Sequence, residues 1–131
     1  EILETQNSAT PATVDLLARM QEYVEPMADI LSGKGELSSI GPMLNESWML
    51  KRSVATDISS PPVDDYYKRG MGAGATGGKI LGAGGGGFLL LYVEPERQQS
   101  VIDELAPLQF LRSRFDTAGS RITYYEPSRF N

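Results

Sequence analysis

The chain contains neither cysteine nor histidine. Without cysteine it can form no disulfide, no thiolate metal site and no cysteine nucleophile. Without histidine it lacks the commonest general base and the commonest metal ligand. Any chemistry must therefore use backbone amides, carboxylates, hydroxyls, lysine or arginine. No paired-carboxylate motif is present either, so we assign no catalytic residue and no metal ligand within this sequence.

The chain also lacks an excess of basic residues and a long apolar run. Its net charge of −5 argues against binding nucleic acid through a broad basic surface. The longest apolar run, Phe88–Val93, is too short to span a membrane. Residues Glu1–Glu4 do not resemble the start of a signal peptide, so we expect a cytoplasmic protein. With 131 residues, 40% hydrophobic and 22% charged, the chain is typical of one globular domain.

The first half of the chain has the spacing of helices. A proline after a hydroxyl residue, at Thr10–Pro11, is a favourable helix start. We expect Pro26 to kink this first helix and Gly33 to end it. Two further helices are predicted from Leu37 to about Val54 and from Ser60 to Gly70–Gly74, with Gly41–Pro42 as an interruption. The first helix has apolar residues at helical spacing, namely Val14, Leu17, Met20, Val24, Met27 and Leu31.

The second half changes to short apolar runs that are typical of strands. We predict strands at Gly78–Leu81 and Phe88–Val93, a helix at 95–105, and a final hairpin formed by 110–115 and 122–125. This order predicts an α+β domain with an antiparallel, ferredoxin-like sheet of about four strands. Helices should cover one face of the sheet, and a helical segment should precede it.

The most informative segment lies between the first two predicted strands. Five of its six residues are glycine, and the segment comprises Gly82, Ala83, Gly84, Gly85, Gly86 and Gly87. Glycine costs about 0.5–1 kcal/mol per ordered position, so a folded protein keeps a run of it where the backbone must approach a ligand. Outward N–H groups of such a loop form a concave site for anions such as phosphate. We therefore predict that these six residues bind the nucleotide cofactor; the ordinary alternative is a flexible hairpin connection.

Two common glycine motifs do not fit this region. The dinucleotide pattern matches at Gly72–Gly77 and at Gly82–Gly87, but it requires a strand before it and a helix after it. The first match follows a helix, and the second is followed by a strand. The Walker A pattern also fails, because Ala73 replaces its first glycine and Ile80 stands where serine or threonine is needed.

The segment Gly78–Phe88 resembles the third conserved motif of the GHMP kinases, the family of galactokinase and of the homoserine, mevalonate and phosphomevalonate kinases. In that family the motif is a glycine-rich loop of the C-terminal domain. Two further stretches resemble the D-glycero-D-manno-heptose 7-phosphate kinase branch of the family. They are Trp48–Arg52, with the pattern Trp-x-x-Lys-Arg, and Gly119–Tyr124, with the pattern Gly-Ser-Arg-Ile-x-Tyr. The resemblance covers nearly the whole chain, so residues 1–131 are expected to be a GHMP kinase C-terminal domain.

This resemblance implies a kinase that uses ATP and Mg²⁺ to phosphorylate the anomeric hydroxyl of a heptose 7-phosphate. Family members also have an N-terminal domain that carries the main phosphate loop and an acidic catalytic residue, and neither motif is found in these 131 residues. We therefore expect the chain to work with its own N-terminal domain and to be inactive alone. A homodimer is a further partner that the sequence leaves open.

Three cations are candidates for contacts with the sugar phosphate. Lys79 lies at the entry to the glycine loop, and Lys51 and Arg52 lie one helical turn after Trp48. Arginine in particular suits a bidentate phosphate contact. The ordinary alternatives are an exposed strand lysine and a solvated helix face. The competing function for the whole chain is a free-standing ferredoxin-like module that binds a ligand or mediates dimerisation without catalysis.

Overall fold

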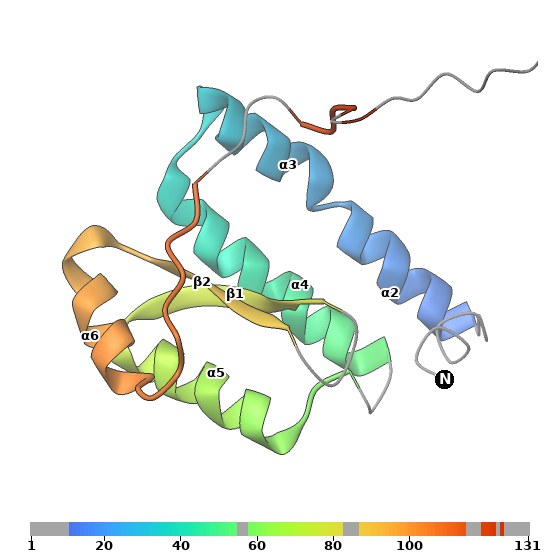
Figure 1. The fold of residues 1–131 in the computed structure, drawn as a ribbon. Coiled ribbons are helices and arrows are strands. Elements are labelled where there is room, and N and C mark those ends of the chain that lie inside the picture. Colours follow the sequence, from blue (N-terminus) through green and yellow to red (C-terminus); the bar gives the residue numbers. More distant parts are fainter. Residues whose placement is uncertain (1–10, 55–57, 83–86, 115–118, 123, 125–131) are drawn as a thin grey trace, which may run out of the picture.

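The computed structural model describes residues 11–54, 58–82, 87–114, 119–122 and 124 (Figure 1). Helices make up its first half, and a two-stranded antiparallel sheet and a short helix follow them. None of the helices in the described part of the chain has both the length and the apolar character needed to cross a bilayer.

The N-terminal helix is broken earlier than predicted. Helix α2 spans Pro11–Gln21 and helix α3 spans Val24–Asp29, so Pro26 lies in the first turn of α3. Proline is tolerated there because its missing N–H needs no helical partner, whereas a continuous helix would require that N–H to bond to Glu22. The break therefore lies four residues before the proline. A π-helical turn, η1 (Ile30–Lys34), follows, and Gly33 within it has a non-helical φ of +83°.

The helix face that packs also differs from the one predicted. Val14, Leu17, Val24 and Leu31 are 47–60% exposed. The half-buried or buried side chains form an overlapping stripe of Leu16, Met20, Tyr23, Met27 and Ile30, which shares Met20 and Met27 with the predicted one. This second stripe has the same helical spacing, and helix α2 lies against α4 (Figure 1). Two apolar stripes were available in the sequence, and contact with α4 selects the second.

Helix α4 (Ile40–Val54) follows a short 3-10 turn, η2 (Leu37–Ser39), and helix α5 spans Pro61–Ala73. Gly41–Pro42 does not interrupt α4, because both residues lie in its first turn, where a proline is compatible with the helix. Helix α5 begins with two prolines after Ser60, as predicted. It ends at Gly74, whose φ of +126° turns the chain directly into the sheet.

The sheet consists of β1 (Ala75–Leu81) and β2 (Phe88–Val93), paired antiparallel with Lys79 opposite Leu90 and Leu81 opposite Phe88. Strand β1 begins three residues earlier than predicted. After β2 come a 3-10 turn, η3 (Pro95–Arg97), and helix α6 (Gln98–Glu104). The predicted helix at 95–105 is therefore confirmed in type and approximate length.

The final predicted hairpin is not formed by the residues that the structure describes. Residues 110–114 and 119–122 have no regular secondary structure, and 115–118, 123 and 125 lie outside the described residues. Phe110 and Leu111 belong to the first predicted strand and Ile122 to the second. These side chains are 53–81% exposed, so no packing stabilises a strand there. The described sheet has two strands, and a four-stranded ferredoxin-like sheet stays a prediction.

The small core lies where α4, α5 and the sheet meet. Trp48 of α4 and Tyr67 of α5 are 2% and 5% exposed, and their ring centroids are 6.4 Å apart. Aromatic pairs at this separation stabilise a core beyond the area that they bury. The other buried hydrophobic residues of the described chain are Ile30, Ile40, Ala75 and Val101.

The closest contact between α4 and the sheet is made by backbone atoms. A Cβ atom at Gly77 would overlap the carbonyl oxygen of Gly41, and a Cβ atom at Gly41 would overlap the side chain of Thr76. Two glycines therefore allow the first turn of α4 to rest directly on the start of β1. This contact sets the position of the helix along the strand.

We predict that Gly77→Ala lowers the free energy of unfolding by about 2–3 kcal/mol, because the added methyl group must push a helix backbone away. Gly72→Ala is the matched control. Gly72 is exposed on α5, and a Cβ there would have no heavy atom within 4 Å. That change should stabilise the helix by up to about 1 kcal/mol. Urea unfolding of both variants measures the difference, and an equal effect of the two substitutions would contradict the packing described.

Candidate functional site

The glycine loop connects β1 to β2 at one end of the sheet. The structure describes its two ends, Gly82 and Gly87, whereas Ala83, Gly84, Gly85 and Gly86 lie outside the described residues. The two end residues have φ values of +120° and +144°, which side-chain-bearing residues rarely adopt. A Cβ at Gly87 would also overlap the carbonyl oxygen of Leu81. Both ends of the loop therefore require glycine, and neither carries a side chain that would keep a ligand from the backbone.

Lys79 lies in β1, two residues before the last strand residue, and is half-buried. Residues directly opposite in an antiparallel pair share a face, so Lys79 lies beside Leu90 on the face that also carries Leu81 and Phe88. Among the described residues, Lys79 has no acidic partner. Its charge is therefore not neutralised by the part of the domain that the structure describes.

Lys51 and Arg52 lie in the last turn of α4 and differ in their surroundings. Lys51 is half-buried and forms no ion pair with any described residue. Arg52 forms an ion pair with the first turn of α5, in which its Nη2 lies 2.6 Å from Oδ2 of Asp64. Oδ1 of the same carboxylate accepts a hydrogen bond of 2.6 Å from the hydroxyl of Ser59. Arg52 is therefore held in one position, whereas Lys51 has no such anchor.

The fold brings these groups towards the same end of the domain. Helix α4 and strand β1 are in contact at their starts, through Gly41 and Gly77, and both run from left to right in Figure 1, crossing obliquely. From Gly41 to Arg52 the helix advances about 17 Å, and from Thr76 to Leu81 the strand also advances about 17 Å. The last turn of α4 therefore reaches the level of the glycine loop. The Arg52–Asp64 ion pair joins the start of α5 to the same end.

A part-buried hydrogen bond between α5 and α4 stabilises this arrangement. The Tyr67 hydroxyl donates a 2.8 Å hydrogen bond to Oδ1 of Asn45 and so joins α5 to α4. Burial raises the pKa of the Tyr67 phenol above its usual value, while the Gly78 backbone and the positive charge of Arg52 lower it in part. The phenol is therefore neutral at ordinary pH and remains a donor. We assign it a structural role, because its side chain is inaccessible to a ligand.

The sequence did not indicate Asp64 or Ser59 as members of this cluster. Asp64 fits the preference for acidic residues in the first turn of a helix, where the macrodipole favours a negative charge. That preference does not distinguish it from Asp65, the next residue. The tertiary contact with Arg52 distinguishes the two, and no local pattern in the sequence reports it.

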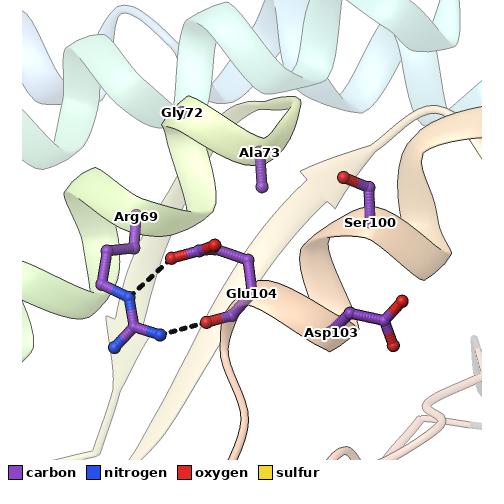
Figure 2. Close-up of a pocket in the computed structure, with 6 residues that line it drawn as sticks. All are labelled: Arg69, Gly72, Ala73, Ser100, Asp103 and Glu104. Atoms are coloured by element: carbon purple, nitrogen blue, oxygen red, sulfur yellow. Dashed lines mark hydrogen bonds and ion pairs between the residues drawn. The ribbon is translucent and has the colours of Figure 1, made fainter.

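A hollow elsewhere on the surface lies between α5 and α6 (Figure 2). It is near the start of β1, because its lining residues Gly72 and Ala73 lie three and two residues before the first residue of that strand. The cation at its edge, Arg69, is already paired, with Nε 2.8 Å from Oε1 of Glu104 and a second bond to the Glu104 carbonyl (Figure 2). Asp103 adds a further negative charge to its lining. This hollow is therefore a poor site for a phosphate and is separate from the glycine loop.

The described residues offer no preformed site for a divalent cation. No group of three or more acidic side chains is placed to hold a metal ion in this part of the chain. Asp64, the carboxylate nearest to the candidate cations, already accepts bonds from Arg52 and Ser59. What this end of the domain offers is a backbone loop and three cations, which is chemistry suited to an anionic ligand.

Comparison with known proteins agrees with this geometry. Residues 26–109, more than half of the chain, match the family model for the GHMP kinases C terminal domain. One similar curated protein is the D-glycero-alpha-D-manno-heptose 7-phosphate kinase of Campylobacter jejuni subsp. jejuni serotype O:2. It is 29% identical over 72 residues, which cover 55% of this chain and 21% of that protein. The aligned part therefore spans about a fifth of the length of this relative. With its glycine-bounded loop between two antiparallel strands, the chain belongs to the GHMP kinase family, as a C-terminal domain of that family.

Proposed function

We propose that the whole protein is an ATP-dependent kinase that phosphorylates the anomeric hydroxyl of D-glycero-D-manno-heptose 7-phosphate. The proposal is supported by the family match and by the chain positions of the candidate residues: Lys79 lies in the strand that leads into the glycine loop, and Lys51 and Arg52 lie in the last turn of α4. The relative named a heptose 7-phosphate kinase supports the choice of sugar.

The chemistry of the site suits two phosphate-bearing ligands. ATP would supply the phosphoryl group, and backbone donors of Gly82–Gly87 would bind its phosphates. Phosphoryl transfer depends chiefly on positioning and on stabilising negative charge, which backbone amides and lysine can supply. In this proposal Lys79 contributes positive potential at the loop, and Lys51 and Arg52 bind the phosphate already present on the sugar.

The acidic group that orients the sugar hydroxyl and the binding of Mg²⁺ are assigned to the protein's own N-terminal domain. The described residues contain no carboxylate cluster for the metal, and their best-placed carboxylate, Asp64, is engaged by Arg52. Catalysis would then require both domains, with this one supplying the glycine loop and the sugar-phosphate contacts.

The substrate is tested by steady-state kinetics of the full-length protein with heptose 7-phosphate, galactose and mevalonate compared side by side. We predict the highest kcat/KM for heptose 7-phosphate, because a substrate with a distal phosphate can use charge-assisted bonds that a neutral sugar cannot form. A higher kcat/KM for galactose or mevalonate would show that the assigned branch of the family is wrong. Absence of ATP turnover with every acceptor would favour a non-catalytic binding module.

The cation site is tested by Lys51→Gln combined with Arg52→Gln in the full-length protein. Glutamine can still donate to Asp64, so the fold should be preserved. Hydrogen bonds to charged groups contribute about 1.5–3 kcal/mol, so KM for the sugar phosphate should rise about tenfold to a hundredfold while KM for ATP changes little. The salt dependence of the sugar-phosphate KM should also weaken.

The matched control for that pair removes one lysine and one arginine elsewhere, by Lys68→Gln with Arg97→Gln. Both side chains are exposed, and Arg97 lies beside Gly74, which precedes the start of β1. The control should leave both KM values unchanged. If the control and the test pair raise KM equally, only the net charge of the domain matters, and the proposed phosphate contacts are wrong.

The role of the loop is tested by Gly87→Ala. An added Cβ would overlap Leu81 and strain a φ of +144°, so the loop should lose its position relative to the reacting phosphate. Losing one well-aimed donor lowers kcat by about a hundredfold to a thousandfold in comparable sites. Gly33→Ala is the control, since Gly33 has a φ of +83° and open space around it. It should cost about 1–2 kcal/mol of stability with kcat unchanged; a folded Gly87→Ala enzyme with normal kcat would exclude the loop from catalysis.

A further inference from the structure

The carboxylate of Asp64 accepts bonds from two side chains that lie outside its own helix. Arg52 comes from the end of α4 and Ser59 from the connection before α5, and each approaches a different oxygen at 2.6 Å. The side chains of Asp64 and Arg52 are 27% and 34% exposed, so the pair is partly shielded from water. Charge-assisted bonds at this distance and burial are stronger than those of exposed ion pairs.

The next residue of α5, Asp65, provides a comparison for Asp64. The Asp65 side chain is 66% exposed, and its ion-pair partner Arg69 lies 3.9 Å away on the same helix. The two aspartates are adjacent, but Asp64 lies in the first turn of α5 and forms the ion pair with Arg52 of the candidate phosphate site.

The geometry leaves part of the Arg52 guanidinium available. Asp64 bonds to Nη2, and among the described residues no acceptor is bonded to Nε or Nη1. A guanidinium is planar and rigid, so fixing one nitrogen fixes the directions of all five of its N–H donors. Ser59 in turn fixes the rotation of the Asp64 carboxylate.

We propose that Asp64, oriented by Ser59, is a positioning residue that holds the Arg52 guanidinium ready for the sugar phosphate. The inference rests on the proposed function, because it assumes that Arg52 binds that phosphate. The inference adds Asp64 to the proposed site and gives it a physical role. An arginine that is ordered before binding loses less conformational entropy when the ligand binds.

Positioning and simple neutralisation predict opposite effects of Asp64→Asn. If Asp64 only cancelled the charge of Arg52, its neutralisation would strengthen the attraction for a phosphate and lower KM. If Asp64 positions Arg52, the loss of the charge-assisted bond frees the guanidinium and raises KM. The sign of the change therefore distinguishes the two roles.

The test is a double-mutant cycle in the full-length enzyme, with heptose 7-phosphate and ATP as substrates. We expect Asp64→Asn to raise KM for the sugar phosphate about tenfold, with kcat and KM for ATP nearly unchanged. In an Arg52→Gln background the same substitution should have almost no further effect, since Asp64 acts through Arg52. Ser59→Ala should raise KM for the sugar phosphate about threefold. Because it removes only the bond to Oδ1 and leaves the Arg52–Asp64 ion pair in place, it also serves as the test if the Asp64→Asn protein does not fold.

Asp65→Asn is the matched control, with the same change on the adjacent residue and no expected effect on either KM. A lowered KM in Asp64→Asn, or equal effects with and without Arg52, would overturn the positioning role while leaving the kinase proposal intact. A normal sugar-phosphate KM in Arg52→Gln would overturn this inference together with the phosphate site. A sugar other than heptose 7-phosphate as best substrate, with Arg52→Gln still raising KM for heptose 7-phosphate, would refute the choice of substrate alone.

Discussion

The backbone contact between Gly41 and Gly77 is the constraint on which the rest of the arrangement depends. Two helices or a helix and a strand usually meet through side chains, which leave freedom to slide. Here the absence of Cβ atoms brings α4 onto β1 at one defined point. From that point helix α4 and strand β1 each advance about 17 Å, so the last turn of α4 comes to the level of the end of β1. A contact at one end of the sheet thus sets the position of the cations at the other end.

The three candidate cations differ in their acidic partners. Lys51 and Lys79 have no acidic partner among the described residues, so they contribute positive potential and can follow a mobile ligand. Arg52 forms an ion pair with Asp64, which offsets its positive charge but fixes the direction of its N–H donors. In the proposed phosphate site, an oriented guanidinium and two amines without acidic partners would recognise both the shape and the charge of the ligand.

The sequence identified the elements that are governed by local rules. Prolines marked the starts of α2 and α5, and glycine marked the end of α5. The glycine run between two apolar segments correctly placed the connection between β1 and β2. Prediction from the sequence was less reliable where the local pattern fitted two alternative structures equally well. Helices α2 and α3 carry two apolar stripes, and the predicted one is largely exposed. Alternation at 110–114 predicted a strand, but alternation is stable as a strand only when a neighbour covers its apolar face.

Backbone preferences and the side chains present were enough to predict the helical first half, the antiparallel pair, the glycine run between its strands and the types of chemistry available. Which helix face is buried, how far α4 extends along β1, and the pairing of Arg52 with Asp64 rather than Asp65 emerged from the folded structure. The difference lies in the range of the interactions. Propensities act within a few residues, whereas the Gly41–Gly77 contact and the Arg52–Asp64 ion pair join groups that become neighbours only when the chain is folded.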